Sequence, residues 1–290
     1  MNTRFFRAAM ILLTMSAAAL AGCGAEEPAG KGAVSFTTWG EEYIEKEIPA
    51  AVFEDGWSVR FSKFLVVIGD VTIADEAGAE GGRRKETKLF DHVAPGPKKV
   101  EDFGDLEAKA WTKVSYEVRP AASDTKLGDG ATADDLTMMQ MGGHSVYVEG
   151  EATKGAEKKT FEWGFSTAIE YADCEGDRDG KPTRGVIVTN GGTDTVELTI
   201  HGDHFFYDDL QSPSAVVRFN AIASADADMD GEVTLAELSM KQLVDIDPAD
   251  GGYGTGAVGD VNDLGAFVTA LSQTLGHFRG EGECFAADPK

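Results

Sequence analysis

Alternating acidic side chains mark one stretch of the sequence as a cation-binding loop. Residues 226–237 read DADMDGEVTLAE, with Asp226, Asp228 and Asp230 at every second position and Glu237 at the end. Carboxylate oxygens are the ligands that calcium prefers, and it takes about seven oxygens at roughly 2.4 Å. The spacing therefore predicts a Ca²⁺ site built from one short loop.

The loop closely resembles that of the EF-hand family, over roughly residues 213–245. The resemblance implies that Glu232 binds through its backbone carbonyl, Thr234 directly or through water, and Glu237 with both carboxylate oxygens. Gly231 permits the sharp reversal of the chain. Because calcium is abundant outside the cytosol, we expect the ion to be structural and nearly permanently bound.

EF-hands usually work in pairs, and a second acidic loop follows at residues 245–259. Asp245, Asp247 and Asp250 begin it, but their spacing is irregular and the stretch is rich in glycine. A divergent second hand and a capped loop without metal both stay open, and we favour the capped loop. Val233, at the eighth position of the first loop, is expected to pin that loop to the core.

A second group of metal-ligand residues lies in the segment 201–209, which reads HGDHFFYDD. His201 and His204 could supply ligands for copper or zinc. The competing interpretation is a packed junction between the strands and the helices, since two histidines three residues apart need not converge. A methionine-rich segment adds soft-metal candidates, with core packing as the competing interpretation: Met138, Met139, Met141 and His144.

The first residues have the pattern of a bacterial export signal. Two arginines precede an apolar run that is too short to span a bilayer. The run ends in Leu20–Cys23, which resembles the lipobox of bacterial lipoproteins. The resemblance implies cleavage after residue 22 and acylation of Cys23, so that 1–22 is the signal peptide and 23–33 a lipidated tether. We expect a cell-envelope protein held in a membrane by its lipid, at the outer membrane or cell surface rather than the inner membrane.

Charge and cysteine content narrow the partners. Without the signal the chain keeps 50 acidic and 24 basic residues, a net charge of −26. Such a chain repels nucleic acid, which we exclude as a partner. Cys174 and Cys284 remain after lipidation, and two cysteines in an oxidising compartment are expected to pair.

The hydrophobic pattern changes along the chain from strands to helices. Short β-branched and aromatic runs bounded by turn residues extend from Val34 to His201 and predict an antiparallel β-sandwich over 34–210. Helical spacing begins after Pro213, and Val261 to Leu275 predicts the clearest helix, with Asp260 as its N-cap. A helical EF-hand module is therefore expected over 211–290.

The sequence supports three functional hypotheses in order. The first is a non-catalytic, lipid-anchored envelope protein with a structural Ca²⁺, acting as a structural or interaction module for an unidentified protein or carbohydrate. The second is a periplasmic copper- or zinc-handling protein that uses His201, His204 and the methionines. A hydrolase with an unrecognised site ranks third, because the sequence contains no recognised nucleophile motif, phosphate loop or metalloprotease helix.

Overall fold

Two β sheets form most of the protein, whose computed structural model describes residues 30–289. The smaller sheet has the strand order β14-β13-β1-β4. Strand β1 pairs with β13 in parallel and with β4 in antiparallel fashion. Its strands are β1 (Lys31–Trp39), β4 (Lys98–Glu107), β13 (Thr193–Ile200) and β14 (Gly276–Phe278).

The larger sheet is organised around the long strand β2, which pairs with β3, β6 and β8. Strand β9 extends it beyond β8, and β10, β11 and β15 extend it beyond β6. Its strands are β2 (Ser58–Ala74), β3 (Glu80–Asp91), β6 (Lys113–Val118), β7 (Lys126–Leu127), β8 (Val146–Lys154), β9 (Glu157–Phe165), β10 (Ile169–Arg178), β11 (Lys181–Arg184) and β15 (Glu283–Ala287).

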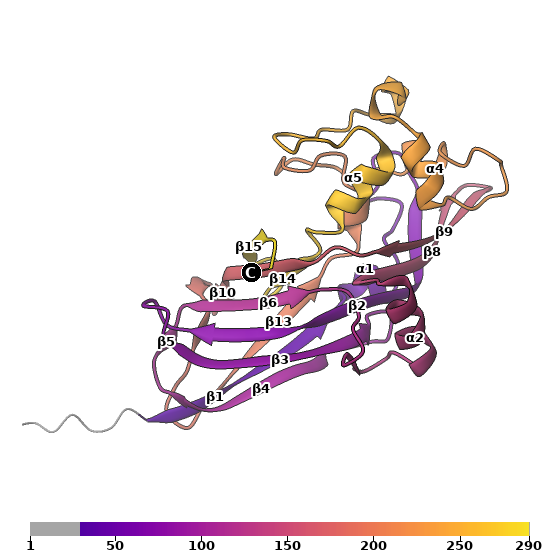
Figure 1. Ribbon diagram of the computed structural model, residues 1–290. Coiled ribbons are helices and arrows are strands. Elements are labelled where there is room, and N and C mark those ends of the chain that lie inside the picture. The colour runs from indigo at the N-terminus through magenta and orange to yellow at the C-terminus, as the bar shows by residue number, and fades with distance from the viewer. Residues whose placement is uncertain (1–29, 290) are drawn as a thin grey trace, which may run out of the picture.

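Short helices and one small ladder complete the fold. Strands β5 (Ala110–Trp111) and β12 (Val186–Ile187) pair with each other. Helices α4 and α5 lie together beyond one end of the sheets, near β8 and β9 (Figure 1). The helices are α1 (Glu41–Glu45), α2 (Ala133–Gly142), η1 (Asp203–Phe206), α3 (Asn220–Ala223), α4 (Leu235–Met240), η2 (Leu243–Asp245), η3 (Pro248–Asp250) and α5 (Leu264–Leu271).

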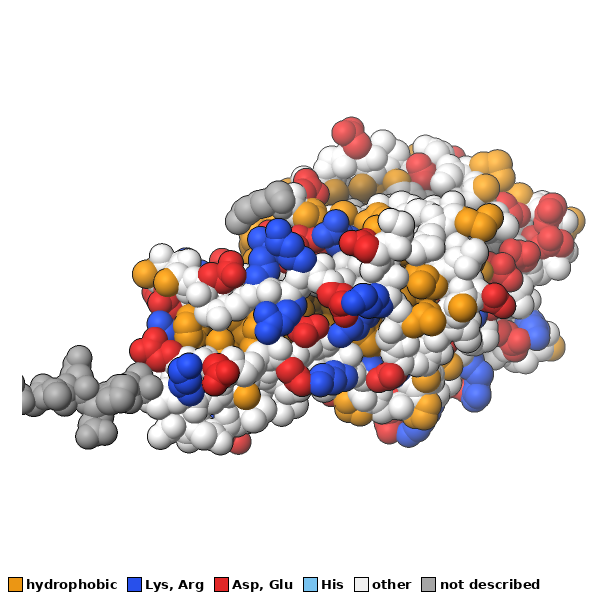
Figure 2. All heavy atoms as spheres, turned by 60° about the horizontal axis from the view of Figure 1, so that its bottom comes forward, with side chains coloured by type: hydrophobic (Ala, Val, Ile, Leu, Met, Phe, Trp, Pro, Cys, Tyr) orange, Lys and Arg blue, Asp and Glu red, His pale blue; other side chains and the backbone are white. Residues whose placement is uncertain are grey.

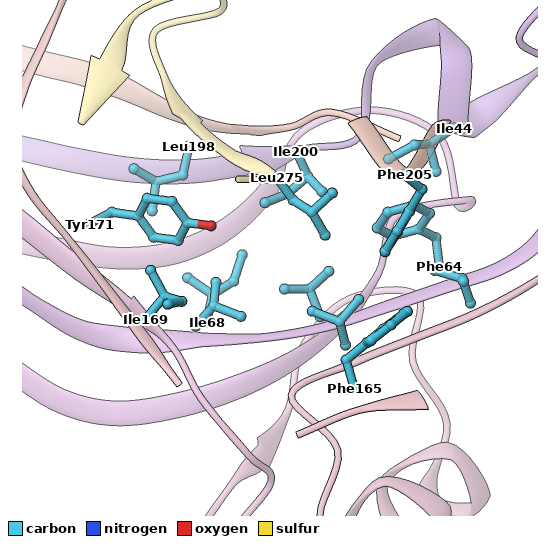
Figure 3. Packing of buried hydrophobic residues seen from close by; sticks show 14 of the residues in the cluster. Ile44, Phe64, Ile68, Phe165, Ile169, Tyr171, Leu198, Ile200, Phe205 and Leu275 are labelled. Carbon is cyan, nitrogen blue, oxygen red and sulfur yellow. The ribbon is translucent and has the colours of Figure 1, made fainter. Parts of the chain in front are cut away.

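The main hydrophobic core lies between the two sheets. Leu198 and Ile200 of β13 face Ile68 of β2 and Ile169 of β10 (Figure 3). All belong to one cluster of buried residues that also reaches Phe205 of η1, so the segment after β13 is part of the core. Burial of this apolar surface is the main stabilising contribution to the fold.

The fold is mainly β with C-terminal helices, as the sequence predicts, but two details differ. The purely antiparallel arrangement is wrong, because β1 and β13 run parallel over seven register positions from Ala33 to Trp39. The helices are also shorter than predicted. α5 begins at Leu264 and its N-cap is Asp263, whose side chain accepts a hydrogen bond from the Ala266 amide, so Asp260 does not cap it.

The C-terminal segment returns to both sheets after α5. Strand β14 pairs with β13, and β15 pairs with β10. Cys174 and Cys284 form the predicted disulfide, with an S–S distance of 2.01 Å. The last part of the predicted module at 211–290 therefore belongs to the sheets of the β domain, and the disulfide holds this C-terminal segment against them.

The surface carries charges of both signs. In Figure 2 basic and acidic side chains are interspersed over the face that is turned toward the reader. An ion pair links the two sheets: Lys88 of β3 lies 3.3 Å from Glu101 of β4. No helix among residues 30–289 is long and apolar enough to cross a membrane. The predicted signal peptide and Cys23 lie outside the described residues.

Candidate metal sites

Three buried histidines converge where β13 ends and β14 begins. His201 follows β13, His204 lies in η1, and His277 is the middle residue of β14. One ring nitrogen from each lies within 4.8 Å of the others. The ring centroids of His201 and His277 are 4.2 Å apart, and those of His204 and His277 are 5.0 Å apart. We call this group the three-histidine site.

Close packing of the backbone holds these histidines in place. Gly202 lies between two of them, and a Cβ atom there would come within 2.7 Å of Ile44 in α1. The His201 amide donates to the Leu275 carbonyl at 2.9 Å, which aligns β13 with the segment that enters β14. The site therefore depends on contacts between segments far apart in the sequence.

Hydrogen bonds assign the tautomer of His204. Thr274 Oγ1 donates its only proton to the Leu271 carbonyl at 2.9 Å. Its distance of 3.0 Å from His204 Nδ1 must therefore be a hydrogen bond that Thr274 accepts. Nδ1 of His204 carries the proton, and Nε2 has the lone pair that a metal ion needs.

The other two rings contain nitrogens without partners. Nε2 of His201 and Nδ1 of His277 are buried and find no hydrogen-bond partner among residues 30–289. Glu283 Oε1 lies 4.0 Å from His277 Nδ1, which is too far for a hydrogen bond. Buried polar atoms are normally paired, so two such nitrogens in one cluster point to a missing partner.

Burial keeps the imidazoles of His204 and His277 neutral. Burial, with further contributions from His277 and His201, lowers the pKa of His204 to about 3. Burial and the neighbouring His201 lower the pKa of His277 to about 4. Both side chains are therefore neutral at neutral pH, which is the protonation state that binds metals.

Carboxylates surround the three-histidine site. Burial raises the pKa of Asp203, whose Oδ2 accepts a hydrogen bond from the Tyr207 hydroxyl at 3.1 Å. Glu41 Oε1 lies 3.7 Å from His201 Nε2. Glu41, His201 and Glu281 form a second group with ligand atoms within 4.8 Å of one another. Imidazole nitrogens beside carboxylates make an environment that favours a cation.

Comparisons with known proteins add little to this geometry. No protein-family model and no curated protein sequence matches the chain. Among solved structures it is similar to MbnP from Methylosinus trichosporium. That likeness has a TM-score of 0.34 at 9% identity and covers 61% of this chain and 77% of the other. A likeness this weak supports no functional conclusion.

The predicted calcium loop brings part of its ligand set together. Oxygens of Asp226, Asp228 and Glu237 lie within 4.8 Å of one another. Gly231 has φ +92°, which is the left-handed conformation expected at the reversal. Oδ1 of Asp226 is buried and has no partner among the described residues. These three carboxylates and the turn fit a calcium ion.

Several loop groups are already engaged within the protein. Lys159 Nζ lies 2.6 Å from Asp226 Oδ2. Glu237 forms a capping box with Thr234, whose amide and hydroxyl both donate to Glu237 Oε2 at 2.9 Å. Asp230 Oδ1 accepts from the Glu232 amide at 2.8 Å. Of the four carboxylates predicted as ligands, Asp230 is the one outside the converging group.

Strand β9 covers the loop where a second hand would be expected. The Thr160 amide donates to the Gly231 carbonyl, and the Val233 amide donates to the Thr160 carbonyl, each at 2.8 Å. Trp163 Nε1 donates to the Val233 carbonyl at 2.8 Å. Val233 is fully buried, as predicted. The partner of this loop is thus an edge strand of the larger sheet.

The remaining candidates do not converge. Asp245, Asp247 and Asp250 form no metal-ligand group within 30–289. In the methionine segment the side chains separate, because Met139 is fully buried in a small core under α2, whereas Met141 is 84% exposed. The methionines and His144 therefore do not extend the three-histidine site.

Sequence analysis missed His277. It stands alone in the sequence Gly-His-Phe, with no neighbouring ligand residue. The available signal was its position two residues after the predicted end of the last helix at Leu275, a point from which the chain could return to the sheets. A three-residue strand is too short for a hydrophobic period to predict.

Proposed function

We propose that this protein binds one transition-metal ion, copper or zinc, through His201, His204 and His277. One observation carries the proposal: the three buried rings converge, and two of them hold buried nitrogens without partners. A metal ion would supply a partner to several nitrogens at once. Imidazole suits both copper and zinc, and three protein ligands leave a position open for water or a further ligand.

The proposed role is to hold or transfer the metal. The hydrogen bond to Thr274 supports tight binding, because it fixes the proton of His204 on Nδ1 and leaves the lone pair on Nε2 for the metal. A non-catalytic role is part of this proposal.

A structural Ca²⁺ in the loop 226–237 is a second part of the proposal. The convergence of Asp226, Asp228 and Glu237 supports it, as does the unpartnered Oδ1 of Asp226. The ion would displace Lys159 and stabilise the contact of the loop with β9. Its function would be to fix the helical segment against the two sheets.

Location completes the proposal. Acylation at Cys23 would hold the protein in the cell envelope, and a tether that ends where β1 begins at Lys31, rather than at residue 33, would separate the membrane from the fold. Metal ions that reach that compartment would be available to the protein. A protein or carbohydrate partner stays a proposal without a surface assigned to it.

Metal analysis of the purified full-length protein tests these assignments. After exposure to equal amounts of Zn²⁺, Cu²⁺, Ca²⁺ and Mg²⁺ followed by desalting, we expect one copper or zinc per chain and calcium in addition. His277→Ala and His204→Ala should abolish the retained copper or zinc and leave the calcium. His144→Ala, which alters a histidine outside the group, is the matched control. Wild-type protein without bound copper or zinc would refute the three-histidine site.

A further inference from the structure

A second group of ligands lies at the rim of the three-histidine site and shares His201 with it. We call Glu41, His201 and Glu281 the outer site. Their ligand atoms lie within 4.8 Å of one another, and exposure increases from buried His201 through half-buried Glu41 to exposed Glu281. The three-histidine site, in contrast, is buried throughout. The two groups together lead from solvent into the protein.

His201 connects the two groups. It is 6% exposed, and its unpartnered Nε2 lies 3.7 Å from Glu41 Oε1. On its other side the ring packs against His277, at 4.2 Å between centroids. An ion held by the two carboxylates and His201 is therefore already in contact with one ligand of the buried site.

Both carboxylates are attached to fixed segments. Glu41 is the first residue of α1, and Glu45 at the end of that helix accepts hydrogen bonds from Trp39 Nε1 and the Gly96 amide, each at 2.6 Å. Glu281 lies in the turn after β14, where the Phe278 amide donates to the Gly282 carbonyl at 2.8 Å. The outer site therefore exists before an ion arrives.

We propose that Glu41, Glu281 and His201 form an outer cation site through which a divalent metal ion passes into the three-histidine site. This inference rests on the proposed function. A divalent ion in water must lose its hydration shell to reach three buried nitrogens, which is costly in one step. Carboxylates bind ions that retain water, so they allow the exchange of ligands to proceed in stages.

The outer site also selects the ion. Carboxylate oxygens are hard ligands, whereas Cu⁺ prefers sulfur ligands. The methionines that could have supplied sulfur lie elsewhere in the fold, as described above. An access route lined by two carboxylates and one imidazole is suited to Zn²⁺ or Cu²⁺. The inference thus narrows the proposed ion to Zn²⁺ or Cu²⁺ and excludes Cu⁺.

Stopped-flow mixing of the full-length protein with Zn²⁺, and separately with Cu²⁺, tests the route. We expect Glu281→Gln and Glu41→Gln each to slow association by about tenfold or more, within the range over which local charge changes association rates. A site used only for passage affects the rates in both directions equally. Dissociation into excess chelator should therefore slow by the same factor, and Kd should stay within about threefold of wild type.

Glu283→Gln is the matched control. It removes one carboxylate from the same turn-and-strand segment, near His277, without removing a member of the outer site. If all three variants slow association equally while dissociation is unchanged, a general electrostatic field acts and the route is refuted. Higher Kd with unchanged association would make the carboxylates final ligands and would likewise refute passage.

The outcomes separate this inference from the proposed function. If wild type binds neither ion, or binds them independently of His277, the three-histidine site fails. If binding depends on His277 but both carboxylate variants load at the wild-type rate, only the outer site fails. Glu281 is exposed, so its variant should fold normally, and thermal melting of Glu41→Gln against wild type checks the folding of the other.

Discussion

The ammonium group of Lys159 lies 2.6 Å from Oδ2 of Asp226, which is the first residue of the predicted calcium loop. Lys159 extends from β9, the strand that also bridges the loop through Thr160. Its side chain is 16% exposed and that of Asp226 is 1% exposed, so the pair is largely removed from water. The lysine supplies an internal cation in the place where an external one is proposed.

Replacing Lys159 by methionine should raise the calcium affinity of the full-length protein by about tenfold or more. A charge-assisted hydrogen bond contributes roughly 1.5–3 kcal/mol, and calcium must displace this one. Isothermal titration with Ca²⁺ measures the change. Lys158→Met is the control, because Lys158 pairs with Glu151 on the neighbouring strand instead. Weaker calcium binding in Lys159→Met would show that the lysine supports the loop and does not compete for it.

Glu237→Gln should abolish stabilisation by calcium while it preserves the helix start. Glutamine can retain the capping box with Thr234 but lacks the charge that calcium needs. In wild type, calcium at a hundredfold excess over Kd should add about 2.7 kcal/mol to the free energy of unfolding. Thermal melts with calcium and with chelator check this, with Glu232→Gln as a control whose side chain is not expected to bind. Equal calcium shifts in wild type and Glu237→Gln would contradict the loop assignment.

Thr274→Val should weaken metal binding at the three-histidine site by about ten- to a hundredfold. The loss follows because the hydroxyl fixes the proton on His204 Nδ1, and the loss of a hydrogen-bond partner of a metal-binding histidine typically weakens metal binding by that much. Competition with a chromophoric chelator measures Kd. Thr269→Val is the matched control, since its hydroxyl bonds only the Gly265 carbonyl within α5. Unchanged affinity in Thr274→Val would place the metal ligand of His204 elsewhere.

The double variant Cys174→Ser, Cys284→Ser should lose about 2–5 kcal/mol of stability, because the bond closes a long loop of the unfolded chain. Urea titration measures it. Metal affinity should fall as well, because β15 and its disulfide hold the segment that follows His277. Intact protein should gain 2 Da on reduction. Full stability and affinity in the double variant would show that the strand ladders alone suffice.

Acid should destabilise the metal-free protein through His92. Burial, with a smaller effect from Lys98, lowers the pKa of His92 to about 3, while the unfolded chain has its ordinary value near 6.5. Between these values the unfolded state binds more protons, so stability falls as pH decreases, by up to about 1.4 kcal/mol per unit.

Urea titrations between pH 7 and pH 4.5 measure that slope. His92→Gln, which keeps a polar group near the Thr38 hydroxyl, should have a shallower slope than wild type. The comparison isolates His92, because His204, His277 and the carboxyl groups with raised pKa contribute equally to the slope in both proteins. Identical slopes would mean that His92 does not remain neutral in the folded state.

The features that depend on short stretches of the sequence could be predicted. The loop 226–237 is recognisable because its acidic residues and Gly231 stand at fixed spacing, and the structure brings three of its carboxylates together. The disulfide was predictable because only two cysteines remain after Cys23. The succession from strands to helices followed from the change of hydrophobic period near Pro213.

Contacts between distant segments could not be predicted in this way. The parallel pairing of β1 with β13 joins Phe36 to Val196, and nothing in either strand specifies the other. The contact of β9 with the loop between α3 and α4, through the bridge of Thr160 with Glu232, likewise joins segments far apart in the sequence. His277 reaches His201 only through the pairing of β14 with β13.

The wide sequence separation of His277 from His201 and His204 sets an order for folding and metal binding. His201 and His277 become neighbours only when the last strand of the smaller sheet has docked beside β13. An unfolded chain therefore offers isolated imidazoles. If the proposed function is correct, metal binding follows folding, and the bound ion would record the metal supply of the compartment in which the chain folds.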